Sequence, residues 1–211
     1  GTGYCAYLDD HTLYLGTNTG LYVKDIASPA SSFKLVENSR GQVYHVGRYG
    51  NDLLMGHHSG AFRIDNDRST RISSEPGGWI FLQLRQKPGV LVEGSYNGLQ
   101  LLAKGSGDHW STRTSLDGFR ESSRVMEQDR DGVLWITHGY KGVYKIVLND
   151  SATQIKSVRF YGSSEGFPSN VLINVFNIRN ELVFTSEDGV YKYDKASDRF
   201  IREPFFTGLL G

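Results

Sequence analysis

The feature that most limits how this chain can fold is an internal repeat that occurs five times. Each copy consists of an apolar segment, a short polar tip, a glycine followed by a small or aliphatic residue, and a second apolar segment. Successive anchoring glycines lie 38 to 47 residues apart, and a four-stranded propeller blade needs about 40–50 residues. The anchors are Gly20, Gly60, Gly98, Gly142 and Gly189.

The composition of the copies favours strands over a helical repeat of similar period. The apolar segments alternate with polar residues and are rich in Val, Tyr, Phe, Leu and Ile, as β-strands are. Proline is scarce, and no long stretch has helical periodicity. We therefore predict an all-β fold of about five four-stranded antiparallel propeller blades. A β-sandwich with accidental similarity between its segments is the alternative. The predicted blades cover residues 1–38, 39–76, 77–117, 118–164 and 165–211.

Two sets of turns support this interpretation. Glycine at each anchor supplies the positive φ that a tight hairpin demands. A second turn signal precedes the first apolar segment of four copies, and we expect it to join the first two strands of the blade. These signals are Asp9-Asp10-His11, Gly50-Asn51, Pro88-Gly89 and Asp131-Gly132. In the fourth blade the strands are expected at 123–129, 133–137, 142–148 and 155–161.

A binding surface is expected on one face of the disc. In an up-and-down blade, the loops between the second and third strands and the connections between blades emerge on the same side. Loops on a rigid scaffold commonly carry binding residues, and aromatic and cationic side chains are favoured at recognition surfaces. The alternative is that polar tips only face water while the aromatics pack between blades. The candidate ligand-binding residues are His57, Trp79, Tyr96, Phe119, Arg120, Tyr140, Lys141 and Phe167.

Composition and motifs argue against several classes of function. Lys+Arg and Asp+Glu number 23 each, which gives a net charge of zero and argues against a nucleic-acid binder. The single Cys5 cannot form an intramolecular disulfide. The sequence contains no Gly-x-Ser-x-Gly elbow, Walker loop or Rossmann fingerprint. We therefore expect no catalysis and no cofactor. A propeller lyase or glycosidase remains the enzymatic alternative.

Two short motifs raise the question of a metal site. His57-His58 lies on a turn, where adjacent side chains point apart, and no further ligands at suitable spacing join them. Asp129 and Asp131 resemble a fragment of a calcium loop, but the remaining ligands are missing. We expect no metal site.

The ends of the chain suggest a piece of a longer protein. No apolar run is long enough to span a bilayer. The start, Gly1-Thr2-Gly3-Tyr4, has no initiator Met and no features of a signal peptide. We expect residues 205–210 to lead into a further blade.

Three segments are specific enough to indicate a family. They are residues 94–99 (Gly-Ser-Tyr-Asn-Gly-Leu), residues 131–145 and residues 165–170 (Glu-Gly-Phe-Pro-Ser-Asn). The repeat resembles the periplasmic propeller repeats of Bacteroidetes sensor-regulators: the hybrid two-component sensors and their triple-tyrosine-motif relatives with LuxR-type DNA-binding ends. The resemblance covers essentially the whole chain. Blades of the family start with Asp-Gly-Leu-Pro-Ser-Asn, and here Phe167 replaces the leucine of that motif. Residues 77–79 and 208–211 resemble the triple-tyrosine branch.

The resemblance implies an arc cut from a larger propeller, in a periplasmic region that downstream segments anchor to the inner membrane. It implies a sensor input in transcription regulation, without a kinase or nucleic-acid-binding part of its own. The expected partner is a small molecule such as a glycan fragment, or a protein. The alternative is a structural or protein-interaction propeller that mediates dimerisation or docking. The end blades of an open arc would expose apolar faces, so we expect association through them, including a homodimer.

Overall fold

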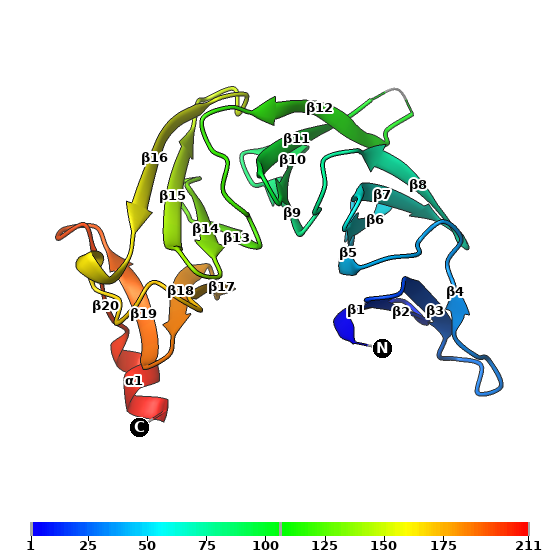
Figure 1. Cartoon of the computed structure of the whole chain (residues 1–211), viewed down its shortest axis with the longest axis horizontal. Coiled ribbons are helices and arrows are strands. Elements are labelled where there is room, and N and C mark those ends of the chain that lie inside the picture. Colours follow the sequence, from blue (N-terminus) through cyan, green and yellow to red (C-terminus); the bar gives the residue numbers. More distant parts are fainter. Residues whose placement is uncertain (1, 106, 211) are drawn as a thin grey trace.

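The computed structural model describes residues 2–105 and 107–210. These residues form five four-stranded antiparallel sheets, each made of four strands that are consecutive in the chain. Figure 1 shows the sheets arranged as blades in an open arc, with the first strand of each blade on the inside and the fourth on the outside. The prediction of an all-β propeller is confirmed.

The strands follow the blades in chain order. Blade 1 contains β1 (Gly3–Asp9), β2 (Thr12–Thr17), β3 (Leu21–Asp25) and β4 (Lys34–Leu35). Blade 2 contains β5 (Val43–Tyr49), β6 (Asp52–His57), β7 (Gly60–Asp65) and β8 (Arg68–Ser73). Blade 3 contains β9 (Ile80–Leu84), β10 (Lys87–Ser95), β11 (Gly98–Lys104) and β12 (Trp110–Leu116). Blade 4 contains β13 (Val125–Gln128), β14 (Leu134–His138), β15 (Gly142–Leu148) and β16 (Ile155–Tyr161). Blade 5 contains β17 (Asn174–Ile178), β18 (Glu181–Ser186), β19 (Gly189–Asp194) and β20 (Arg199–Arg202).

The hydrophobic core lies between the blades. Its four clusters of buried side chains each join two consecutive blades. The middle strands are therefore buried on both faces, and all six residues of β6 are buried. Burial on two faces explains why the apolar runs around the glycines are nearly continuous, and it makes each blade depend on its neighbours.

The anchoring glycines have the conformation that the repeat predicts. All five have positive φ, from +98° at Gly98 to +153° at Gly189. At Gly60 and Gly98 a Cβ would also collide with a backbone carbonyl oxygen, of Ser73 and Phe119 respectively. The hairpin between the second and third strands therefore requires glycine both for its φ and for the close approach of the chain entering the next blade.

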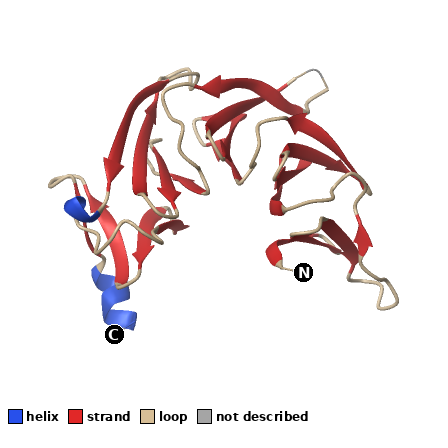
Figure 2. Cartoon of the chain, viewed as in Figure 1, coloured by secondary structure: helices blue, strands red, loops and turns tan. Residues whose placement is uncertain are grey.

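The structure differs from the sequence-based expectation at the first turn of blade 3. Pro88-Gly89 does not form the first turn of blade 3, because the turn is Arg85-Gln86 and residues 88–89 lie within β10, where the register shifts between Lys87 and Leu91. Residues 205–210, which we expect to lead into a further blade, form with Pro204 the helix α1 (Pro204–Leu210), which contacts β19. Figure 2 shows that α1 and the 3₁₀ turn Ser163–Glu165 are the helical segments among strands and loops. No helix within the described residues is long and apolar enough to cross a bilayer.

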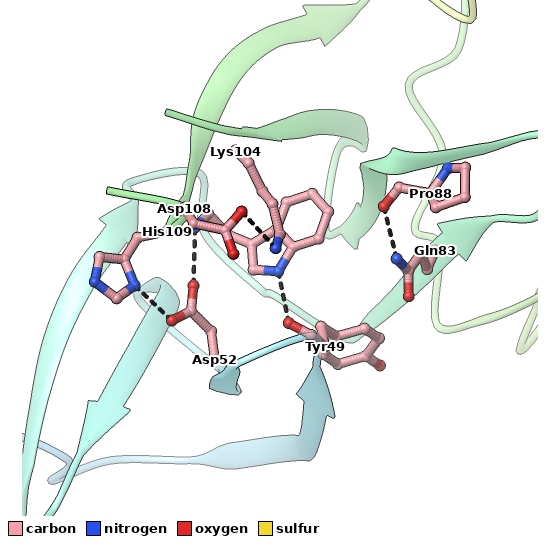
Figure 3. A network of polar contacts seen from close by, with 8 residues as sticks. Tyr49, Asp52, Gln83, Pro88, Lys104, Asp108 and His109 are labelled. Atoms are coloured by element: carbon pink, nitrogen blue, oxygen red, sulfur yellow. Dashed lines mark hydrogen bonds and ion pairs between the residues drawn. The ribbon is translucent and has the colours of Figure 1, made fainter. Parts of the chain in front are cut away.

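A buried carboxylate joins blades 2 and 3 (Figure 3). Asp52, at the start of β6, accepts hydrogen bonds from His109 Nδ1 at 2.7 Å and from the backbone N–H of Trp110 at 2.9 Å. The Trp110 indole N–H donates to the carbonyl of Tyr49 at 2.8 Å. Lys104 lies over the Trp110 ring and pairs with Asp108. The first turn of blade 2 is thus held by the last loop of blade 3.

Candidate functional site

The structure divides the candidate ligand-binding residues into two groups. His57, Phe119 and Phe167 are at most 5% exposed. Phe119 belongs to the core between blades 3 and 4, and Phe167 belongs to the core between blades 4 and 5. Phe119 and Phe167 therefore support the fold, whereas His57 lines a cleft between blades 1 and 2. Trp79, Tyr96, Arg120, Tyr140 and Lys141 retain exposure.

Trp79 and Tyr96 belong to a group of rings that we call the aromatic cluster, made of Tyr4, Tyr44, His58, Trp79 and Tyr96. Tyr44 lies at the centre, with its ring centroid 4.1 Å from Trp79, 5.4 Å from Tyr4 and 6.3 Å from Tyr96. Tyr96 contacts Trp79 at 5.3 Å and His58 at 5.6 Å. The five residues come from blades 1, 2 and 3, and none of them is fully buried.

Backbone hydrogen bonds fix the loop that carries Trp79. The N–H groups of Gly77 and Gly78 donate to the carbonyls of His58 and His57, at 2.8 and 3.0 Å. Trp79 N–H donates to Gly94, so the loop is held by both neighbouring blades. Gly77 has φ +80°, and a Cβ there would collide with the ring of Tyr96. Glycine at this position therefore allows the tyrosine to lie flat against the loop.

A chain of hydroxyl groups orders the cluster. Tyr44 donates to Gln42 Oε1 at 2.6 Å, so Tyr96 must be the donor in the 2.5 Å bond between the two phenols. His58 Nδ1 lies 2.9 Å from the Tyr96 oxygen and must then carry the proton that it donates. Burial, followed by the bond to Tyr96, raises the pKa of Tyr44, so this phenol stays neutral.

Trp79 is the point where the cluster meets polar and cationic groups. Its indole N–H donates to Ser122 Oγ at 3.2 Å, and the Arg124 guanidinium lies 5.5 Å from the ring centroid. Both partners come from the connection into blade 4. An aromatic ring beside hydroxyl, amide and guanidinium groups can stack on the apolar face of a polar ligand while its neighbours form hydrogen bonds.

The remaining exposed candidates, Arg120, Tyr140 and Lys141, make no contact with the aromatic cluster among the interactions of the described residues. Lys141 Nζ lies 2.7 Å from Glu121 Oε2, and His138 Nε2 lies 4.0 Å from the same oxygen. Tyr140 is 78% exposed, and Arg120 lines a small cleft of about 90 Å³ beside blade 3. The structure does not join this group to the aromatic cluster.

The two motifs considered for metal binding make other contacts in the structure. His57 Nε2 bonds the Arg40 carbonyl, whereas His58 bonds Tyr96, so the two rings point apart. Asp129 accepts hydrogen bonds from Asp131 N, Val133 N and Trp135 Nε1, which stabilise its own turn. Within the described part of the chain, no group of three or more His, Cys, Asp or Glu residues is arranged to hold a metal ion.

Sequence reasoning missed Tyr4, Tyr44 and His58 as members of the cluster. Tyr4 and Tyr44 lie on β1 and β5, the innermost strands of their blades, and only loops were considered. A signal for Tyr44 existed, because the alternation of β5 buries Val43 and leaves Tyr44 half-buried. His58 follows the last residue of β6 and therefore lies on the tip, one residue beyond the strand that buries His57.

The fold and this surface define a β-propeller that presents a polar, aromatic loop face. No family model and no curated protein matches the chain. Solved structures do match. The extracellular domain of BT4673 of B. thetaiotaomicron, described as a putative hybrid two component system, superposes with a TM-score of 0.67 at 17% identity over 90% of this chain. That of BT3049, of the same organism and description, has a TM-score of 0.63 at 18% identity over 94% of this chain.

These neighbours support the fold, and this chain matches only part of each of them. The chain spans about a quarter of their length, 26% of BT4673 and 28% of BT3049. The WD40 β-propeller domain of Doa1 also matches, with a TM-score of 0.60 at 13% identity, over 91% of this chain and 64% of that one. The resemblance that the repeat motifs indicate is thus confirmed at the level of the blade architecture.

Proposed function

We propose that this chain is the ligand-recognition propeller of an extracytoplasmic, membrane-anchored bacterial signal-transduction regulator. It recognises a soluble small molecule, of which a glycan fragment is the best-fitting class, and has no catalytic role of its own. The aromatic cluster carries this proposal. Its half-buried and exposed rings and its ordered hydroxyls offer stacking faces and hydrogen bonds together, which suits a polar ligand with apolar faces. The extracellular domains that share the fold support the extracytoplasmic setting.

The chain provides its own optical probe for this site. Of its three tryptophans, Trp110 and Trp135 are 1% exposed, whereas Trp79 is half-buried within the aromatic cluster. A ligand that stacks on the cluster should therefore change only the emission of Trp79. We expect a saturable change in fluorescence on titration with members of a soluble glycan panel, together with a rise in the melting temperature.

Matched variants test the assignment. Trp79→Phe should remove the fluorescence response and retain the thermal shift. Tyr96→Ala should weaken the affinity measured by either response by about tenfold, since an aromatic contact contributes about 0.5–1.5 kcal/mol beyond its buried area and tenfold corresponds to about 1.4 kcal/mol. Tyr140→Ala, on the same face but outside the cluster, is the control. A broad panel that produces neither response would exclude the glycan proposal, and equal effects of Tyr96→Ala and Tyr140→Ala would exclude this location.

The exposed apolar side chains on the end blades favour a second candidate function, docking of another protein or a second copy. Leu8 on β1 is 54% exposed, and Phe176 and Ile178 on β17 are 47% and 40% exposed. Exposed apolar strand residues favour association. Light scattering over a range of concentrations should then show dimers that Phe176→Ser weakens. A monomer at the highest concentration would exclude this candidate.

A further inference from the structure

A second feature of the loop face is a wide cleft of about 740 Å³ between blades 1 and 2. It lies beside the tip of blade 2, the same tip that contributes His58 to the aromatic cluster. The connection between the two blades forms one wall, and β6, β7 and β8 form the other. Its polar lining includes Glu37, Asn38, Arg40, His57, Ser59 and Arg71.

His57 connects the two walls of this cleft. Its Nδ1 accepts a hydrogen bond from Ser59 N–H at 3.0 Å, so the ring proton lies on Nε2, which donates to the Arg40 carbonyl at 3.2 Å. The ring is 4% exposed, and a Cβ at Gly41 would lie within 3 Å of it. Burial lowers the pKa of His57, so the ring stays neutral. His57 therefore fixes the position of the backbone that carries Arg40.

Arg71, on the wall of the cleft opposite Arg40, is held by Ser59 and, through Ser59, by His57. Its Nη2 donates to Ser59 Oγ at 3.3 Å, and Ser59 Oγ lies 2.8 Å from His57 Nδ1. The guanidinium lies 5.3 Å from the ring centroid of Phe62, which in turn contacts His57. These contacts order the planar guanidinium while most of its N–H donors have no acceptor among the described residues.

The charges around the cleft leave both arginines without an acidic partner. Glu37 is the acidic residue of the lining, and it is paired with Arg68 at 2.9 Å. No ion pair of Arg40 or Arg71 is formed with any residue that the structure describes. Arg40 and Arg71 both line the cleft and neither forms an ion pair, so the cleft has a positive potential that an anion would relieve. Planar carboxylate, sulfate and phosphate groups match the guanidinium fork.

We propose that the cleft between blades 1 and 2 is an anion-binding site in which Arg40 and Arg71 bind a carboxylate, sulfate or phosphate group. The inference deepens the proposed function and rests on it in one respect: the loop-face ligand would be an acidic saccharide. The sugar ring would lie at the aromatic cluster, and the acidic group would lie in the cleft. His57 and His58, adjacent in the chain, would place the two subsites next to each other.

The test uses the 211-residue chain and simple probes. Inorganic sulfate and glucuronate are titrated in parallel at constant ionic strength, with sodium chloride as the competing salt and glucose as the neutral counterpart of glucuronate. Binding is followed by two-dimensional NMR of the backbone amides. We expect saturable shifts of the amides of residues 37–42 and 57–60 with both anions. Glucose is expected to leave them unchanged.

Charge-deleting variants identify the residues. Arg40→Gln and Arg71→Gln should each weaken anion binding by about tenfold, the usual cost of losing one charge-assisted interaction. Arg113→Gln removes the same charge from β12, the outer strand of blade 3, and should leave binding unchanged. Ser59→Ala should weaken binding less than Arg71→Gln, because it only loosens the arginine. Absence of saturable binding, or equal losses in Arg71→Gln and Arg113→Gln, would overturn the inference.

The outcomes separate this inference from the proposed function. If sulfate and glucuronate bind through Arg40 and Arg71 while a glycan panel leaves Trp79 unaffected, the anion site stands and the glycan proposal fails. If neutral glycans bind at Trp79 while neither anion binds in the cleft, the proposed function stands and the anion site fails. If Tyr96→Ala and Arg71→Gln each weaken the binding of one acidic oligosaccharide, the proposed function and the anion site are both supported.

Discussion

The unpaired carboxyl group of Glu93 leads to the most quantitative prediction. Glu93 lies on β10 and is 0% exposed. Neither of its carboxyl oxygens has a hydrogen-bond partner among the described residues. Burial, with a contribution from the charge of Glu75, raises the pKa of Glu93 to about 7, although the Ser73 hydroxyl opposes the shift. The side chain is therefore protonated in the folded state at mildly acidic pH.

The sign and size of the effect on stability follow from linkage. Between the ordinary pKa of 4.5 and the folded value of about 7, the folded state retains a proton that the unfolded state has released. Stability must therefore fall as the pH rises through this window, by about 3 kcal/mol at its upper end. Glu93→Gln cannot titrate, so its stability relative to the wild type should rise by about 3 kcal/mol between about pH 4.5 and pH 8.5.

A partly buried histidine, His45, has the opposite effect on stability. Burial lowers the pKa of His45 from 6.5 to about 4, so the unfolded state binds more protons between these values. The contribution of the neutral His45 to the free energy of unfolding is complete above about pH 6.5 and is lost as the pH falls toward about 4. In the wild type the two groups nearly cancel between about pH 4.5 and 6.5. In Glu93→Gln the free energy of unfolding should therefore fall as the pH is lowered toward about 4, because the protonation of His45 is no longer offset.

Urea denaturation followed by circular dichroism at about pH 4.5 to 8.5 measures both effects. The difference in the free energy of unfolding between Glu93→Gln and the wild type is compared across pH. Any constant cost of burying the glutamine amide then cancels. Glu181→Gln, at a side chain that is 75% exposed, controls for the change in net charge. Parallel stability profiles for Glu93→Gln and the wild type would refute the reasoning.

Two further predictions concern the joints between blades. Asp52→Ala leaves the Trp110 N–H and the His109 ring without their acceptor. It should lower the free energy of unfolding, measured by urea denaturation, by about 3 kcal/mol. His109→Ala removes only the half-exposed donor and should lower the free energy of unfolding by about 1 kcal/mol or less. Gly98→Ala combines a φ of +98° with a collision against the Phe119 carbonyl and should lower the melting temperature by several degrees, whereas Gly89→Ala, with open space around it, should not.

The repeat could predict the blades because its signal is local. Each anchor such as Gly60 or Gly142 needs a positive φ within its own hairpin, and that requirement can be read from a few residues. The position of Pro88-Gly89 could not be predicted in this way, because the pairing of β10 with β9 and β11 decides the register. Cross-strand pairing is a property of segments that meet only in the folded state.

The candidate site was only half predictable for a related reason. Trp79 and Tyr96 are on loops, where sequence reasoning looks for binding residues. Phe119 and Phe167 are on connections of the same kind but are buried between blades. Whether an aromatic residue beside a strand points to the ligand face or into the interface between blades depends on the neighbouring blade. A single blade's sequence does not contain that information.

The tips of blades 3 and 4 both carry a tyrosine beside the anchor, but the two tyrosines have different surroundings. Tyr96 and Tyr140 occupy the same position, two residues before the anchors Gly98 and Gly142. Tyr96 lies on the loop at Gly77, whereas Tyr140 is 78% exposed, and the residue that corresponds to Gly77 in the connection to blade 4 is Ser122. The tip of blade 4 is also one residue longer, because His138 pairs with Gly142 whereas Ser95 pairs with Gly98. At the tip of blade 3, the absence of a side chain at Gly77 leaves room for the Tyr96 ring.

Gly77→Ser should therefore displace the Tyr96 ring, because a Cβ at residue 77 would overlap it. Trp79, whose ring centroid lies 5.3 Å from that of Tyr96, would become more exposed, and its emission should shift to longer wavelength and be quenched more strongly by acrylamide. Gly118→Ser is the matched control: Gly118 also has positive φ, at +95°, but a Cβ there meets nothing within 4 Å. The control should strain the backbone without changing Trp79. An unchanged Trp79 spectrum in Gly77→Ser, or the same shift in both variants, would show that the glycine does not create the aromatic cluster.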